Sequence, residues 1–140
     1  MADGPALAMQ LAIVAALRAS GSVAALVGSR IYDEPPDGAV LPYVRLGAIE
    51  PLPQRSTGTD GVRLMFGIEA HSRPTAGRVE ATRICEAVVA LFDGATQALA
   101  PIGYRVVSLE WMTQTTGRDD DGKTYLGITA FQALIEPDGS

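Results

Sequence analysis

The stretch that decides the fold is Ile102–Ile135, which reads IGYRVVSLEWMTQTTGRDDDGKTYLGITAFQALI. In it, two alternating, strand-like runs flank the polar segment Gly117–Thr124, which contains three consecutive aspartates. An Asp-Gly pair between two such runs is a strong signal for a β-hairpin. The stretch therefore predicts two neighbouring strands, at about Tyr104–Thr116 and Lys123–Ile135, onto which the rest of the chain packs.

The same polar segment also has the pattern G-x-x-x-x-G-K-T, which is typical of a phosphate-binding loop. Such a loop leads into a helix whose N-terminus faces the phosphates. Here Thr124 is followed by Tyr125–Phe131, which is β-branched and aromatic, and Asp119–Asp121 would repel a polyphosphate. We therefore favour a hairpin turn. A P-loop-like nucleotide-binding protein that uses residues 117–124 is the alternative.

The three aspartates also raise the question of a calcium site. Asp119, Asp121 and Gly122 fit the third, fifth and sixth positions of an EF-hand loop. The first and twelfth positions, which need ligand oxygens, are then Gly117 and Ile128. A solvated turn explains the aspartates better, and we predict no metal site.

Catalytic constellations are equally sparse. His71 is the only histidine and Cys85 the only thiol, so a Cys–His pair would have to be this one. A histidine at a strand end and a cysteine in a helix core is the simpler explanation, because free cysteine is among the most buried residue types. We expect no catalytic residues and no cofactor, and we do not expect an enzyme.

Composition limits the classes of protein to consider. The 140 residues suit a single domain, 1–140, and 47% hydrophobic with 19% charged residues is ordinary for a globular protein. A net charge of −5 argues against binding nucleic acid by neutralising phosphates. The apolar run Ala6–Leu17 is shorter than the roughly 20 residues that span a bilayer, so we expect a buried helix and no membrane partner.

The remaining periodicities predict an α+β protein with the element order α-β-β-α-β-β. We expect a largely antiparallel four-stranded sheet with two main helices packed on one face. Residues 50–60 are rich in Pro, Ser, Thr and Gly and predict a mobile arm, and residues 136–140 form a short polar tail. The helices are expected at about 5–20 and 74–92, the strands at about 43–49, 61–71, 104–116 and 123–135, with a helical turn at 23–27 and an extended piece at 30–32.

Alternation along the strands predicts two unlike sheet faces. The face under the helices is expected to carry Val44, Leu46, Leu64, Phe66, Leu109, Trp111, Leu126 and Ile128. The opposite face would then be rich in aromatic residues, Met and Arg, which are enriched in protein interfaces. We interpret it as a subunit interface; a second core layer built by loops is the alternative. The interface candidates are Tyr43, Arg45, Met65, Tyr104, Met112, Tyr125 and Phe131.

Two stretches together resemble a known family. The first is Leu26–Asp33 with its continuation Leu41–Gly47, and the second is Asp121–Gly127 followed by Phe131. In this order, and with the intervening helix, they are similar to the tail-completion or tail-terminator proteins of long-tailed phages and gene transfer agents. The similarity covers nearly the whole chain, although its motifs are structural and define no chemistry.

The resemblance implies a structural virion protein that forms a homo-hexameric ring on the head-proximal end of the tail tube. The protein is expected to be assembled into the tail in the host cytoplasm. Its expected partners are the tail tube protein and the head-tail connector (stopper) protein, and DNA would pass through the lumen without specific binding. Arg55 in the arm and Asp119, Asp120 and Asp121 in the turn are the candidates for contacts above or below the ring. A small adaptor domain that forms no ring is a further alternative.

Overall fold

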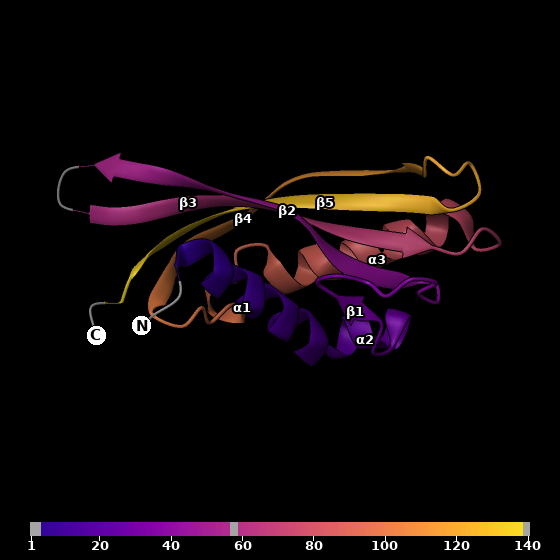
Figure 1. Cartoon of the computed structure of the whole chain (residues 1–140), viewed down its shortest axis with the longest axis horizontal. Coiled ribbons are helices and arrows are strands. Elements are labelled where there is room, and N and C mark those ends of the chain that lie inside the picture. Colours follow the sequence, from indigo (N-terminus) through magenta and orange to yellow (C-terminus); the bar gives the residue numbers. More distant parts are fainter. Residues whose placement is uncertain (1–3, 57–58, 139–140) are drawn as a thin grey trace.

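The helices gather on one face of a single sheet and leave the other face bare (Figure 1). The computed structural model describes residues 4–56 and 59–138. In this part of the chain, the sheet has five strands in the order β1-β2-β3-β5-β4. The elements are α1 Pro5–Ala19, α2 Gly21–Val27, β1 Ile31–Tyr32, β2 Tyr43–Ser56, β3 Thr59–Ser72, α3 Gly77–Phe92, the 3-10 helix η1 Thr96–Ala98, β4 Tyr104–Arg118 and β5 Tyr125–Pro137.

The α+β class is confirmed, but the sheet is mixed and not a four-stranded antiparallel one. The short extended piece that follows α2 enters the sheet as β1 and pairs in parallel with β2, with Ile31 opposite Val44. The other neighbouring strands pair antiparallel. The predicted helical turn after α1 is likewise a helix of its own, α2, capped by the Ser20 hydroxyl, which accepts a hydrogen bond from the Val23 amide.

Residues 50–60, predicted to form a mobile arm, extend the pairing of β2 with β3. The register continues from Glu50–Met65 to Ser56–Thr59, and Thr57 and Gly58 lie outside the described residues. The outer side of β2 has no strand partner at this end, because β1 pairs only with residues 44 and 45. Prolines 51 and 53 are tolerated there, since an edge strand can direct the missing N–H outward. Mobility of this hairpin remains a prediction.

One hydrophobic core fills the space between the sheet and its helices. Phe66 and Phe131 stack with ring centroids 5.4 Å apart, and Phe92 from α3 meets Phe131 edge-on at 5.5 Å. The inward side of α3 is buried as a set: Ala81, Ile84, Cys85, Val88 and Phe92, with Leu91 partly buried beside them. The alternation predicted for residues 61–71 is also confirmed, with Leu64, Phe66, Ile68 and Ala70 buried.

The predicted phase of β5 is wrong, and its two faces are exchanged. Phe131 and Ile135 are fully buried, whereas Ile128 is 37% exposed. The cause is the close approach of α3 at one end of the strand: a Cβ atom on Gly127 would lie 2.6 Å from the Cys85 sulfur. The residues that face α3 at this end of β5 are therefore small, and the larger Leu126 and Ile128 point outward. A shift of one residue reverses every side chain of a strand.

The first two helices are apolar because they cover the β1–β2 side of the sheet. No single helix in the described part of the chain is long and apolar enough to cross a membrane; α1 and α2 reach that length only together, across a bend of 76°.

Candidate interaction surfaces

The Asp-rich segment is a hairpin turn between β4 and β5, as predicted. The Asp119 amide donates to the Thr124 carbonyl at 2.8 Å, and the carboxylate of Asp121 accepts hydrogen bonds from the amides of Lys123 and Thr124 at 2.8 and 2.9 Å. These amide donors, Thr124 first, lower the pKa of Asp121 below its usual value. Since Thr124 leads directly into β5, the helix that a phosphate-binding loop requires is replaced by a strand.

The outer face, defined as the sheet face opposite the helices, is not covered by any helix in Figure 1. The side chains at its centre are small, because Gly67 of β3 pairs there with Ala130 of β5. Large apolar side chains stand beside this centre: Met65 is 41% exposed and Ile128 37% exposed. Exposed apolar groups gathered on one face are typical of protein contact sites.

The predicted interface residues divide into three groups. Tyr43, Arg45 and Met65 lie on the outer face, and Met112 is exposed at the bulge of β4 beside it. Phe131 was placed wrongly, because it is a fully buried core residue. Tyr104 packs against the core, and Tyr125 lies on the helix side near the start of α3, so their outer-face placement was wrong as well.

The structure explains Tyr125 differently. Its hydroxyl accepts a hydrogen bond from Arg118 at 3.1 Å, and the Arg118 guanidinium lies 5.2 Å from the centre of its ring. Arg118 also donates to the Gly122 carbonyl. Tyr125 therefore helps to fix the β4–β5 turn. The side chain of Arg55, the candidate in the arm, lies outside the described residues.

A polar cluster occupies the end of the outer face nearest the turn. The rings of Tyr43 and His71 stack at 4.6 Å, and His71 Nε2 lies 2.8 Å from the Glu69 carboxylate. Asp119 of the turn lies 3.8 Å from the other ring nitrogen of His71. Burial is the main cause that raises the pKa of Tyr43. These contacts hold the turn against the sheet, beside a hollow of about 460 Å³ that residues 34–39 border.

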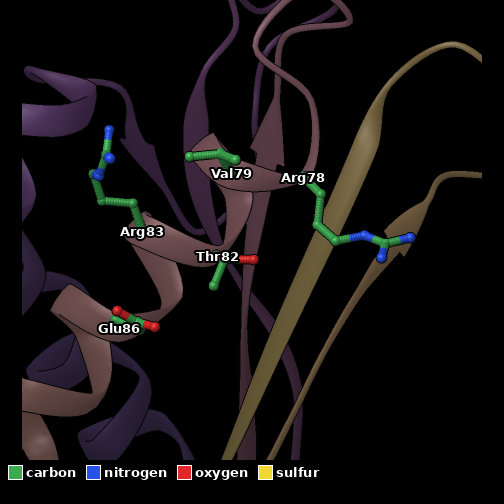
Figure 2. Close-up of a pocket in the computed structure, with 5 residues that line it drawn as sticks. All are labelled: Arg78, Val79, Thr82, Arg83 and Glu86. Atoms are coloured by element: carbon green, nitrogen blue, oxygen red, sulfur yellow. The ribbon is translucent and has the colours of Figure 1, made fainter.

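The last surface is a groove along α3, which the sequence reasoning missed. We name it the α3–β4 groove; it consists of two hollows, of about 330 and 510 Å³, that share Glu86. Its lining residues are Arg78, Val79, Thr82, Arg83, Glu86, Val89, Ala90, Trp111 and Gln114. Figure 2 shows its first half, where Arg78 and Arg83 extend from α3 in opposite directions on either side of Val79 and Thr82.

Trp111 is the aromatic residue of this groove. It was predicted to lie under the helices and does lie on their side of the sheet, paired with Phe131, but it stands beyond the edge of α3 and remains 44% exposed. Its ring N–H donates to the Thr113 carbonyl and its amide donates to Asp93, so the polar groups are satisfied within the chain. The ring face remains available for an apolar contact. One sequence signal could have revealed the groove. Val79 is an apolar residue at an outward position of α3, where polar residues are usual.

None of these surfaces holds a group of three or more His, Cys, Asp or Glu side chains placed to bind a metal ion, within the residues that the structure describes. What they offer is apolar and charged area for contact with other proteins.

The comparisons with known proteins agree with such a role. A family described as "Tail completion protein gp17" matches residues 11–136. Among solved structures, a chain in "Virion of native gene transfer agent (GTA) particle" is 27% identical and has a TM-score of 0.84; the match covers 96% of this chain and 99% of that chain. The comparison with curated proteins finds no match. The chain therefore belongs to the phage tail-completion protein family and has a structural role in a virion tail.

Proposed function

We propose that the chain assembles as a homo-hexameric ring at the head-proximal end of the tail tube, where it ends tube growth and joins the tail to the head. The observation that carries this proposal is the match to the tail completion family over residues 11–136, joined by the likeness to a chain of a gene transfer agent virion. The protein acts through its surfaces and not through catalysis. Its partners are the tail tube protein and the head-tail connector (stopper) protein.

The outer face supports a role in ring contacts. A sheet whose helices all lie on one side leaves apolar side chains such as Met65 and Ile128 in water, unless another protein covers them. Ring symmetry supplies identical neighbours in fixed positions. In this proposal the outer face of each protomer meets the next copy, and Tyr43, Arg45, Met65 and Met112 belong to that contact.

Two protrusions suit contacts with the layers above and below the ring. The β2–β3 hairpin continues beyond the last pair of β3 with β5, Val62–Ile135, and so projects past the sheet (Figure 1). The turn with Asp119, Asp120 and Asp121 projects at the opposite end. We assign one protrusion to the tail tube and the other to the connector. The net charge of −5 suits a channel through which DNA slides without specific binding.

The test is electron microscopy of particles from cells that lack the gene and from complemented cells. Without the protein, we expect tails of uncontrolled length and heads without tails. With it, a six-fold ring should be visible where the tube meets the head. Joined particles of normal tail length in the absence of the gene would contradict the proposal. Purified protein that binds the tube as a single copy would favour a non-ring adaptor.

A further inference from the structure

An acidic loop lies at the edge of the sheet opposite β4, the strand beside which the Trp111 half of the α3–β4 groove lies. It follows β1, the first strand in the sheet order, and reads Asp33-Glu34-Pro35-Pro36-Asp37; we name residues 33–37 the acidic loop. The side chains of Asp33, Glu34 and Asp37 are exposed, and Asp33 is fixed by a hydrogen bond of 2.7 Å from the side-chain amide of Gln10. The groove lies beside β4, the last strand in the sheet order.

The two surfaces differ in charge: the groove carries two arginines, Arg78 and Arg83, and one carboxylate, Glu86. The loop carries three carboxylates in five residues. Arg78 and Arg83 flank the groove, and neither has an ion-pair partner within the described part of the chain. Glu80, which could neutralise them from the same helix, is already bound by Arg73. Guanidinium groups bind carboxylates in a planar, two-pronged geometry, which favours Arg over Lys at such contacts.

The apolar parts of the two surfaces also match. Pro35 and Pro36 stiffen the loop, so little conformational entropy is lost when it is bound. Prolines in an extended segment are commonly received by aromatic side chains in a groove. The α3–β4 groove offers the exposed ring of Trp111 and the side chain of Val79, which is 64% exposed. Aromatic residues and Arg dominate the energetics of protein interfaces.

We propose that the acidic loop of one copy docks into the α3–β4 groove of the next copy. This inference rests on the proposed ring. A head-to-tail contact uses two different surfaces on opposite sides of one protomer, and repetition of that contact closes a ring when the rotation between copies allows it. The loop borders the outer face through the hollow that it shares with Tyr43 and Arg45. Docking it on the next copy therefore brings the outer face toward the same neighbour.

Cross-linking tests the contact directly. Pro36→Cys and Val79→Cys in the same chain place one thiol on each surface, and both positions are exposed. A disulfide needs Cα atoms within about 7 Å, so it reports only a true contact. The native Cys85 is buried, and burial raises its pKa to about 11, which keeps it protonated and unreactive. Ile102→Cys combined with Val79→Cys is the matched control, because Ile102 is 83% exposed and is not part of the acidic loop.

We expect mild oxidation of assembled rings or particles to convert the Pro36→Cys, Val79→Cys chain into linked multimers that end at the ring size. Mixing the two single variants should give linked pairs only, and the control pair should give none. Rings that form normally but stay unlinked would overturn the docking contact and leave the proposed ring intact. Absence of rings from wild-type protein and from particles would overturn both.

A charge exchange gives a second, independent measurement. Arg83→Glu should shift wild-type rings toward single copies, and Glu34→Arg should do the same, because each places like charges together. Combining the two changes restores an opposite-charge pair, so ring formation should recover by sedimentation analysis. Equal loss in the single and double variants would contradict a direct contact between these residues. Normal ring formation in Arg83→Glu would contradict the contact as well.

Discussion

Gly127 shows how a single position sets the distance between a helix and the sheet. An added Cβ would lie 2.6 Å from the Cys85 sulfur, 3.1 Å from Thr116 and 3.3 Å from the Ala81 carbonyl. Contacts this short force the helix or the strand to shift. We expect Gly127→Ala to lower the free energy of unfolding by about 1–3 kcal/mol, the usual cost of overpacking, measured by urea denaturation.

The matched control for this substitution is Gly117→Ala, whose added Cβ meets no atom within 4 Å. Its stability should stay within about 0.5 kcal/mol of the wild type. Cys85→Ala removes the nearest obstacle, so part of the loss in Gly127→Ala should be recovered in the double variant. A Gly127→Ala protein as stable as the wild type would contradict the close approach of α3.

Phe131 and Met65 separate core from surface at the scale of single side chains. Phe131 is fully buried between Phe66 and Phe92, whereas Met65 is 41% exposed on the outer face. Truncation of Phe131 to Ala should lower the free energy of unfolding by about 3–5 kcal/mol. Met65→Ala should change it by about 0.5 kcal/mol or less. Comparable losses in the two variants, measured by thermal or urea denaturation, would be inconsistent with the burial described.

The β4–β5 turn is the element whose stability depends on pH. Amide hydrogen bonds, chiefly from Thr124 and then from Lys123, lower the pKa of Asp121 in the folded state. The charged carboxylate therefore stabilises the fold above its unfolded pKa, and this contribution disappears as the pH falls through the lowered folded pKa. We expect Asp121→Asn to be less stable than the wild type at neutral pH, with the difference shrinking in acid below about pH 4.

The neighbouring Asp120→Asn is the control, because the turn amides of Lys123 and Thr124 donate to the Asp121 carboxylate, whereas Asp120 contributes its backbone amide, which donates to the Asp119 carboxylate. Its stability should follow the wild-type pH profile. Denaturation curves recorded at several pH values distinguish the two variants. A constant difference between wild type and Asp121→Asn at every pH would show that the carboxylate charge plays no part in the turn.

At the scale of the whole molecule, the outer face is expected to matter for assembly and not for folding. Met65→Lys and Ile128→Lys introduce a charge into the proposed ring contact. Lys is suited to both sites, because their cross-strand neighbours Glu50 and Glu69 are acidic and can accommodate it. We expect folded protein with nearly unchanged thermal stability that no longer forms rings by sedimentation or electron microscopy.

Val40→Lys provides the comparison for this surface. Val40 is 66% exposed in the loop before β2 and is not part of the outer face. Ring formation should persist in this variant. If the outer-face variants assemble as well as Val40→Lys does, another surface forms the ring contact.

Local sequence signals predicted most elements correctly. Asp-Gly between two alternating runs located the β4–β5 turn, and the periodicity over residues 74–92 located α3. Local signals predicted an extended piece at 30–32 but not its parallel pairing with β2, because two residues carry too little alternation to define a sheet strand. They also suggested an arm at residues 50–60, since proline and glycine usually indicate loops, whereas an edge strand can accept proline.

The sequence by itself determined the α+β class, the order of the main elements, the position of the Asp-rich turn and the likeness to the tail-completion family. These features depend on neighbouring residues, whose spacing reports turns and periodicity directly. Only the tertiary structure decided which side of β5 is buried and which residues form the α3–β4 groove. Both depend on how closely α3 approaches Gly127 and where it ends beside Trp111, and contacts between residues distant in the chain set those distances.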